Sequence, residues 1–323
     1  MQRKKKLLIT GCHGFIGSSV ADYAIRHGHH VFGVDRAEQH GAVIGMDVLH
    51  CALDQPEFID LLAEYQPDTV VHAAGSASVG YSFTEPREDF HIAVGTWGAL
   101  LDAIRKADLR PTVIFPSSAA VYGNPQRLPV SEQDPLRPIS PYGFHKVICE
   151  QLAQEYVRCF GFHVVAARLF STVGPRQHRL LVWELFRQAV EDHSSVTIQG
   201  SGLESRDFLH IEDIAEYFLG LTERRSEGFL AVNIGSGIAT SVREVADHIL
   251  KSVGSTRRIV TLNKELPGDP KTWEADVSLL HSLVPHRPRA IHEAIGACVD
   301  RWLLEEPPGQ AGMPRVVSGV GGE

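Results

Sequence analysis

The sequence predicts an α/β fold, in which a doubly wound parallel sheet carries a smaller α/β lobe. In the first half of the chain, short runs rich in β-branched residues alternate with amphipathic stretches, which is typical of parallel strands joined by crossover helices. The apolar runs do not alternate in polarity, as expected for strands buried on both faces. After Gly174-Pro175 this rhythm changes, which indicates the smaller lobe.

The elements of the first half follow from these two patterns. Strands are expected in the β-branched runs at 6–10, 30–34, 42–46, 69–73, 112–115 and 164–169. Helices are expected in the amphipathic stretches at 15–27, 56–65, 90–107 and 142–160.

The second half mixes both kinds of element. In chain order it is expected to hold a helix at 180–191, a hairpin-like stretch at 196–208, a helix opening at Glu212-Asp213, a strand at 229–234, a helix at 242–253 and a loop at 267–270. This order predicts a larger domain at 1–170, to which a strand near 229–237 returns, and a smaller lobe made mainly of 171–306. Residues 307–323 are rich in Gly and Pro with few large side chains, and are expected to form a flexible tail.

The composition argues against several classes of function. The chain has 31 basic and 39 acidic residues, and its net charge of −8 gives no electrostatic reason to expect nucleic acid as a partner. The apolar run behind the basic start is too short for a signal peptide or a membrane span, so a cytoplasmic protein with no membrane partner is expected. The five cysteines form no CxxC pair and the 17 histidines no HExxH motif, so neither a disulfide framework nor a metal site is expected.

Three glycines follow the first predicted strand and open the first predicted helix. Gly11, Gly14 and Gly17 let the backbone turn sharply, approach a pyrophosphate and pack the helix against the strand. The N-terminus of that helix offers free N–H groups and partial positive charge to phosphate. This strand–turn–helix context predicts a Rossmann-type dinucleotide site, against the simpler alternative of glycines that only shape a turn.

An acidic residue, Asp35, ends the second predicted strand. Its carboxylate is expected to accept hydrogen bonds from the adenosine ribose and to repel a 2′-phosphate, which favours NAD over NADP. The neighbouring Arg36 weakens this preference, because a cation attracts a 2′-phosphate.

Tyr142 and Lys146 lie four residues apart, so on a helix they share one face. A lysine cation, together with the positive nicotinamide ring of bound NAD, favours the phenolate form of tyrosine, which can act as a base. No other tyrosine in the sequence has a lysine four residues on. Upstream, Ser117 and Ser118 leave a predicted central strand at its carboxyl end, where ligands lie in open α/β sheets, so Ser118 is expected to bind the reacting hydroxyl.

Together these residues resemble the extended short-chain dehydrogenase/reductase family, especially its nucleotide-sugar epimerases and dehydratases of the UDP-glucose 4-epimerase type. The resemblance runs in motif order from about residue 7 to about residue 303. The further motifs that carry it are Asp47-Val48, His72-Ala73-Ala74-Gly75, Arg168-Leu169-Phe170, Gly174-Pro175, Arg206-Asp207-Phe208, Ile211-Glu212-Asp213, Asn233-Ile234-Gly235-Ser236-Gly237 and Pro267-Gly268-Asp269.

The resemblance implies NAD as cofactor, a nucleotide sugar as substrate, and catalysis by Tyr142, Lys146 and Ser118. The implied NAD contacts are Gly11, Gly14, Phe15, Ile16, Gly17, Asp35, Arg36, Asp47, Val48, Ala73, Ala74, Gly75, Ser117, Tyr142, Lys146 and Phe170. The implied substrate contacts are Ser118, Ser171, Arg176, Arg179, Arg206 and Asp269. A homodimer is also implied, through the predicted helices near 90–107 and 142–160.

Two alanines favour one reaction within this family. The dehydratases carry an Asp-Glu pair directly after the active-site hydroxyl residue, and the decarboxylases keep the Glu, whereas Ala119 and Ala120 stand here. Methyl groups cannot transfer protons, so 4-epimerisation through a transient 4-keto sugar is expected. Two alternatives stay open: a dehydratase or other oxidoreductase that uses His91 or Glu132, and a non-catalytic NAD-binding protein.

Three positions depart from the family pattern, which usually has Asn, Asn and Arg at Ser171, Ile92 and Leu266. The first and third normally contact the diphosphate. Arg176, Arg179 or Lys264 can compensate, since phosphate accepts any well-placed cation. The nucleotide base, the sugar and the epimerised carbon therefore stay open.

Overall fold

The computed structural model describes residues 4–37, 43–191, 194–223, 228–264, 268 and 270–305. It is built on a seven-stranded sheet with the order β10-β6-β5-β4-β1-β2-β3, in which every neighbouring pair is parallel. The strands are β1 (Lys6–Thr10), β2 (His30–Asp35), β3 (Asp47–His50), β4 (Thr69–His72), β5 (Thr112–Ser118), β6 (His163–Leu169) and β10 (Phe229–Ile234). The winding reverses between β1 and β4, so the predicted Rossmann-type doubly wound fold is confirmed.

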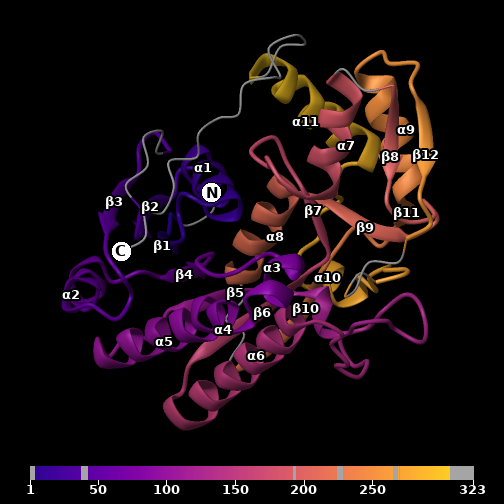
Figure 1. The fold of residues 1–323 in the computed structure, drawn as a ribbon. Helices are drawn as coiled ribbons and strands as arrows, with labels where there is room; N and C mark the ends of the chain where they lie inside the picture. The colour runs from indigo at the N-terminus through magenta and orange to yellow at the C-terminus, as the bar shows by residue number, and fades with distance from the viewer. Residues whose placement is uncertain are drawn as a thin grey trace.

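Helices cover both faces of this sheet (Figure 1). One face carries α1 (Phe15–Arg26) and α8 (Ile211–Glu223), which pack on each other. The opposite face carries α2 (Pro56–Tyr65), α5 (Thr96–Lys106) and α6 (Pro141–Phe160). The sheet is therefore buried on both sides, as its continuous apolar runs predict.

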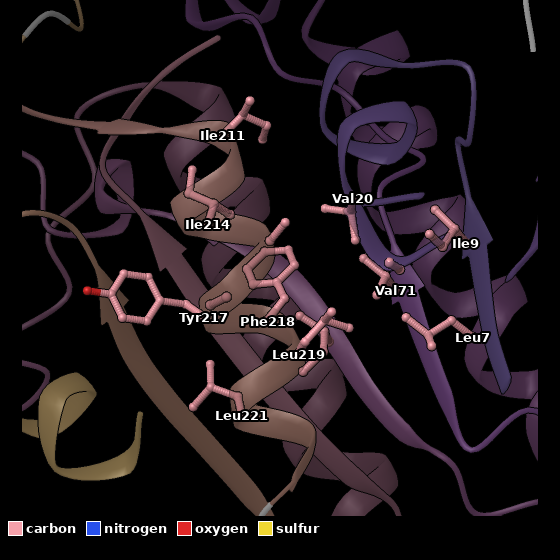
Figure 2. Close-up of a cluster of buried hydrophobic side chains, with 14 of the residues drawn as sticks. Leu7, Ile9, Val20, Val71, Ile211, Ile214, Tyr217, Phe218, Leu219 and Leu221 are labelled. Carbon is pink, nitrogen blue, oxygen red and sulfur yellow. The ribbon is translucent and has the colours of Figure 1, made fainter. Parts of the chain in front are cut away.

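Strand β1 shows how the two faces are filled. The side chains of Leu7 and Ile9 belong to the cluster with α1 and α8, while Leu8 belongs to the cluster with α2, α5 and α6, and all three are fully buried. In Figure 2, Phe218 and Leu219 of α8 lie on the side of that helix that faces Val20 and Val71. Fully burying one such side chain stabilises the fold by about 1.5–3 kcal/mol.

The smaller lobe lies at the upper right of Figure 1. It holds a three-stranded sheet of β11 (Ala239–Ser241), β9 (Ser205–His210) and β7 (Ser171–Val173), and a parallel pair of β8 (Ser195–Ile198) and β12 (Arg258–Thr261). The helices α7 (Leu180–Val190), α9 (Val242–Ser252) and α11 (Ile291–Glu305) pack on these strands around Trp183, Phe186 and Trp302. The short elements are α3 (Val79–Thr84), α4 (Pro86–Phe90), η1 (His91–Gly95), η2 (Ala119–Val121) and α10 (Ser278–Leu283).

The strand expected at 42–46 is wrong. Residue 42 lies outside the described residues, and 43–46 form a turn in which Gly45 has a φ of 86°. The strand begins only at Asp47, opposite Phe32 of β2. A left-handed glycine interrupts the extended backbone, so the apolar residues before it do not join the sheet.

The hairpin expected at 196–208 is also wrong. Strand β8 pairs with β12, and β9 pairs with β7 and β11, so the two neighbouring runs do not pair with each other. Between them, Gly202 adopts a φ of 84° and the Glu204 carboxylate accepts hydrogen bonds from the Ser201 and Gly202 amides. This local turn sends the chain to a different sheet.

The helix expected at 90–107 begins earlier, at Pro86, and consists of three segments. A π-helical stretch, η1, separates α4 from α5.

The predicted tail at 307–323 lies outside the described residues. None of the described helices is long and apolar enough to cross a membrane.

Candidate active site

Gly11 in the loop after β1 and Gly17 in α1 leave no room for a side chain. Gly11 has a φ of 67°, and its amide donates a 2.8 Å hydrogen bond to the Val34 carbonyl. A Cβ on Gly11 would lie 2.4 Å from the Ala74 amide nitrogen, and one on Gly17 would lie 2.2 Å from the Gly11 carbonyl oxygen. The loops after β1 and β4 and the start of α1 are thus in direct backbone contact.

Beside this contact the backbone is open at Gly14 and Gly75. A Cβ on Gly75 would meet nothing within 4 Å, and Gly14 is exposed. Gly14 is the N-cap of α1 and supplies no side-chain hydrogen bond to the first turn, so the N–H groups there are available to a diphosphate. Phe15 and Ile16 follow, both half-buried against the core. These residues fit the NAD diphosphate that the glycine pattern predicts.

The residues expected to contact the adenosine lie at the carboxyl end of β2 and on β3. The Asp35 carboxylate accepts hydrogen bonds from the His13 amide at 3.1 Å and the Ala37 amide at 3.3 Å, which hold it beside the glycine loop. Arg36 is exposed next to it. Asp47 and Val48 stand on the adjacent β3, opposite β2.

We call the turn of Gly11, Gly14 and Gly17 the glycine cradle. Beside it, a buried polar contact holds the ends of β1 and β4 together. The Thr10 hydroxyl and His72 Nδ1 lie 2.8 Å apart and join β1 to β4. Burial, together with the nearby Lys146 cation, lowers the pKa of His72 to about 3, so its ring stays neutral. The His72-Ala73-Ala74-Gly75 segment is therefore held at the strand ends without adding charge to the site.

The helix α6 begins so that Tyr142 and Lys146 lie in its first two turns. The Ser140 hydroxyl caps the helix by accepting a 3.2 Å hydrogen bond from the Gly143 amide, and Pro141 occupies the first turn. Lys146 is buried, and its Nζ donates a 2.9 Å hydrogen bond to the Pro116 carbonyl of β5. The same Nζ lies 5.5 Å from the centroid of the Tyr142 ring.

The two serines at the end of β5 have different roles. The buried Ser117 hydroxyl donates a 2.6 Å hydrogen bond to Glu150 Oε1. The half-buried Ser118 hydroxyl accepts a 3.1 Å hydrogen bond from the Ala120 amide, which leaves its own proton available to a ligand. Lys146 binds the carbonyl of Pro116, which lies two residues before Ser118. The structure thus brings the start of α6, with Tyr142 and Lys146, to the carboxyl end of β5.

Glu150 is a residue near the site that the sequence patterns did not reveal. Arg168 of β6 donates two hydrogen bonds to it, at 3.0 and 2.7 Å, and a third at 2.9 Å to the Tyr122 hydroxyl. Burial alone lowers the pKa of the Arg168 guanidinium, but its hydrogen bonds to Glu150 raise it above the usual value. The available signal was spacing, since Glu150 lies one turn beyond Lys146 on the same face of α6.

The predicted substrate contacts are spread more widely. Arg206 is buried on β9, 5.8 Å from the Trp273 ring centroid, and Ser171 begins the adjacent β7. The buried Phe170 also packs against Trp273.

The structure does not bring the other predicted cations to this place. Arg176 donates a 3.0 Å hydrogen bond to the Ser18 carbonyl of α1, and Arg179 is exposed at the N-cap of α7. Asp269 and Leu266 lie outside the described residues. Among the residues that the structure describes, no group of three or more His, Cys, Asp and Glu could hold a metal ion.

Known proteins share both the sequence pattern and the fold. The model of the family described as "NAD dependent epimerase/dehydratase family" matches residues 7–235. A UDP-glucose 4-epimerase of Mycolicibacterium smegmatis is 31% identical over 264 residues, 77% of this chain and 83% of that protein. A CDP-paratose 2-epimerase of Salmonella typhi is 32% identical over 275 residues, 73% of this chain and 80% of that protein.

The fold is also similar to that of a solved structure. The UDP-glucose 4-epimerase of Brucella ovis in complex with NAD has a TM-score of 0.84 and 28% identity, covering 92% of this chain and 98% of that one. With the family model matching most of the chain and the glycine cradle fitting the cofactor, the chain belongs to the NAD dependent epimerase/dehydratase family, and its cofactor is NAD.

Proposed function

We propose that this protein, an NAD-dependent nucleotide-sugar epimerase, inverts C4 of a UDP-sugar through a transient 4-keto sugar. The observation that carries the proposal is the placement of Lys146, hydrogen-bonded to Pro116 and 5.5 Å from the Tyr142 ring, at the strand end that carries Ser118. The relatives named above act on C4 of UDP-glucose in two cases and on C2 of CDP-paratose in the third, which supports this reaction class.

In this mechanism the chain's own residues move one proton and hold the sugar. Tyr142 takes the proton of the C4 hydroxyl, and Lys146 stabilises the phenolate by its positive charge. The Ser118 hydroxyl donates a hydrogen bond to the C4 oxygen and holds it in place. Bound NAD would supply the hydride acceptor and donor for C4 and would not be consumed. After the keto sugar has turned over, Tyr142 gives the proton back to the C4 oxygen.

The surroundings of the trio favour epimerisation over elimination of water. Ala119 and Ala120 are buried, and their methyl groups offer no proton. The Glu132 side chain accepts a 2.9 Å hydrogen bond from the Asn233 amide, and His91 is exposed on η1. Burial raises the pKa of Glu132, but its carboxylate is engaged with β10. Neither residue supports the dehydratase alternative.

The proposal assigns 1–170, with the returning strand β10, to NAD and 171–306 mainly to the sugar nucleotide. Ser118, Ser171 and Arg206 are its substrate contacts, and the burial of Arg206 on β9, next to the β7 strand that Ser171 begins, supports a diphosphate there. Arg176 and Arg179 are not part of this proposal, because Arg176 is bound to the Ser18 carbonyl and Arg179 is exposed at the N-cap of α7. Asp269 lies outside the described residues and stays a prediction from the sequence. A cytoplasmic location is also part of the proposal.

A homodimer is also part of the proposal. Phe90 of α4 and Phe144 and Ile148 of α6 expose large apolar side chains on the helices expected to meet a partner. Exposed apolar groups on adjacent helices are typical of subunit interfaces. The test is the molar mass in solution by light scattering, where a monomer at micromolar concentration contradicts this part of the proposal.

The function is tested by incubating the NAD-bound protein with UDP-, dTDP- and GDP-sugars and analysing products by mass spectrometry and NMR. An isomer of unchanged mass, inverted at C4, supports the proposal. Loss of one water supports the dehydratase alternative instead. Bound NAD with no reaction on any sugar nucleotide supports the non-catalytic alternative.

A further inference from the structure

A buried carboxylate, Asp89, lies next to the active-site helix and has no role in the mechanism above. Asp89 is the next-to-last residue of the short helix α4 and is fully buried. One carboxylate oxygen lies 2.5 Å from His145 Nδ1, and the other accepts a hydrogen bond from the Ser76 hydroxyl. Both oxygens are therefore occupied, as a carboxylate without access to water requires.

The two partners of Asp89 come from the two segments that the active site must bring together. His145 stands on α6 between Tyr142 and Lys146, so it moves with both. Ser76 follows Gly75 in the loop after β4, the loop whose backbone contacts Gly11 of the glycine cradle. Through Asp89 the tyrosine helix is thus connected to the cofactor cradle. We call Asp89, Ser76 and His145 the Asp89 clamp.

The clamp is enclosed enough to hold its geometry. His145 is almost fully buried, and its ring packs edge-on against Phe90 at 5.3 Å between centroids. Hydrogen bonds to an ionised carboxylate are among the strong ones, and burial removes the competing water. The one-residue spacing from His145 to Lys146 means that any rotation of the helix start moves both side chains.

We propose that Asp89 is a positioning residue for catalysis, which sets the distance between the Tyr142–Lys146 helix and the cofactor cradle by holding His145 and Ser76. This inference rests on the proposed function, because it concerns the placement of the same trio. Hydride and proton transfer depend steeply on distance, and a misplacement of about 1 Å costs on the order of a hundredfold in rate.

The test compares two variants at Asp89. In Asp89→Ala both partners lose their acceptor, and kcat is expected to fall about tenfold to a hundredfold, with the substrate KM within about threefold of wild type and NAD still bound. Asp89→Asn keeps the clamp, because its carbonyl accepts from His145 and its NH₂ donates to the Ser76 oxygen. Its kcat is expected to stay within about threefold of wild type. The matched control is Glu88→Ala, which removes an exposed acid from the same helix.

A second pair of variants covers the case in which Asp89→Ala fails to fold. His145→Leu removes the donor, whereas His145→Asn keeps an N–H near the position of Nδ1, so only the first is expected to lose kcat. Wild-type kcat in Asp89→Ala or in His145→Leu overturns the proposal. An equal loss of kcat in Asp89→Asn and Asp89→Ala also overturns it, since the charge and not the geometry would then matter.

A substrate-independent measurement separates this inference from the proposed function. Hydrogen exchange of the NAD-bound protein is expected to quicken at 73–76 and 141–146 in Asp89→Ala, and not in Asp89→Asn or Glu88→Ala. If the wild type converts no sugar nucleotide, the proposed function fails, while the exchange result still decides whether the clamp joins the two segments. Unchanged exchange in Asp89→Ala contradicts the clamp.

Discussion

Lys146 Nζ donates a 2.9 Å hydrogen bond to the Pro116 carbonyl oxygen, which joins α6 to the C-terminal part of β5. The ammonium group is buried, lies over the Phe115 ring at 4.8 Å and lies 5.5 Å from the Tyr142 ring centroid. The bond to Pro116 therefore holds the ammonium group beside Tyr142 and joins the tyrosine helix to the strand that carries Ser118.

Replacing Tyr142 by Phe removes the acid–base group and little else. Turnover is expected to fall by hundreds-fold or more, on the scale of losing general acid–base catalysis. NAD binding is expected to persist, because the glycine cradle does not contain this side chain. Steady-state kinetics and the NAD content of the purified protein measure the two effects. The control is Tyr156→Phe on the same helix, and near-normal turnover of Tyr142→Phe would refute the assigned role.

A methyl group at Gly17 is expected to disrupt the cradle. Its Cβ would lie 2.2 Å from the Gly11 carbonyl oxygen, so the helix and the loop must separate. Such overpacking typically costs about 1–3 kcal/mol, and the NAD affinity should fall with it. Gly98→Ala in α5 is the control, since the nearest atom to its Cβ is a Leu152 side-chain carbon at 3.7 Å. Thermal unfolding and NAD titration give both quantities; equal behaviour of the two variants contradicts this account.

Removing Glu150 should be costly because it leaves Arg168 buried without its counter-charge. The two side chains are 2% and 5% exposed, so solvent cannot replace the lost partner. Glu150→Ala is expected to lower the free energy of unfolding by about 3–5 kcal/mol. The double variant Glu150→Met with Arg168→Met should cost less than the sum of the single changes. Asp102→Ala, which breaks an exposed pair with Arg105, should cost about 1 kcal/mol or less in urea unfolding.

The buried His72 predicts an acid-sensitive fold. Its pKa is about 3 in the folded protein against 6.5 for the free side chain, so the unfolded chain binds one more proton between these values. The contribution of neutral His72 to the free energy of unfolding is fully present above about pH 6.5 and is lost as the pH falls toward 3.

The variant His72→Asn isolates this effect, because asparagine does not titrate and can still bond to Thr10. Near pH 5, its free energy of unfolding should change with pH by about 1.4 kcal/mol per unit less than that of the wild type. Urea unfolding at several pH values gives the two slopes, and parallel slopes would show that His72 does not carry the effect.

Sequence patterns were enough to predict the sheet and to single out two close backbone approaches, because both depend on local features. Continuous apolar runs mark the buried strands, and glycine is needed at Gly11 and Gly17, where a Cβ would lie 2.4 and 2.2 Å from backbone atoms. The spacing of Tyr142 and Lys146 likewise follows from helix geometry alone. The strand predicted at 42–46 was wrong because Gly45 is left-handed. The hairpin predicted at 196–208 was wrong because β8 pairs with the later strand β12.

The meeting of buried polar groups, in contrast, depends on how the elements pack. Glu150 finds Arg168 and Ser117, and Asp89 finds Ser76 and His145, across elements that are distant in the chain. Lys146 reaches a backbone carbonyl, a partner that no side-chain pattern can reveal. Periodicity in the sequence indicates only which face of an element is buried. A buried charge bonds to the group that the packing of several elements brings within hydrogen-bond distance, and that group can come from anywhere in the chain.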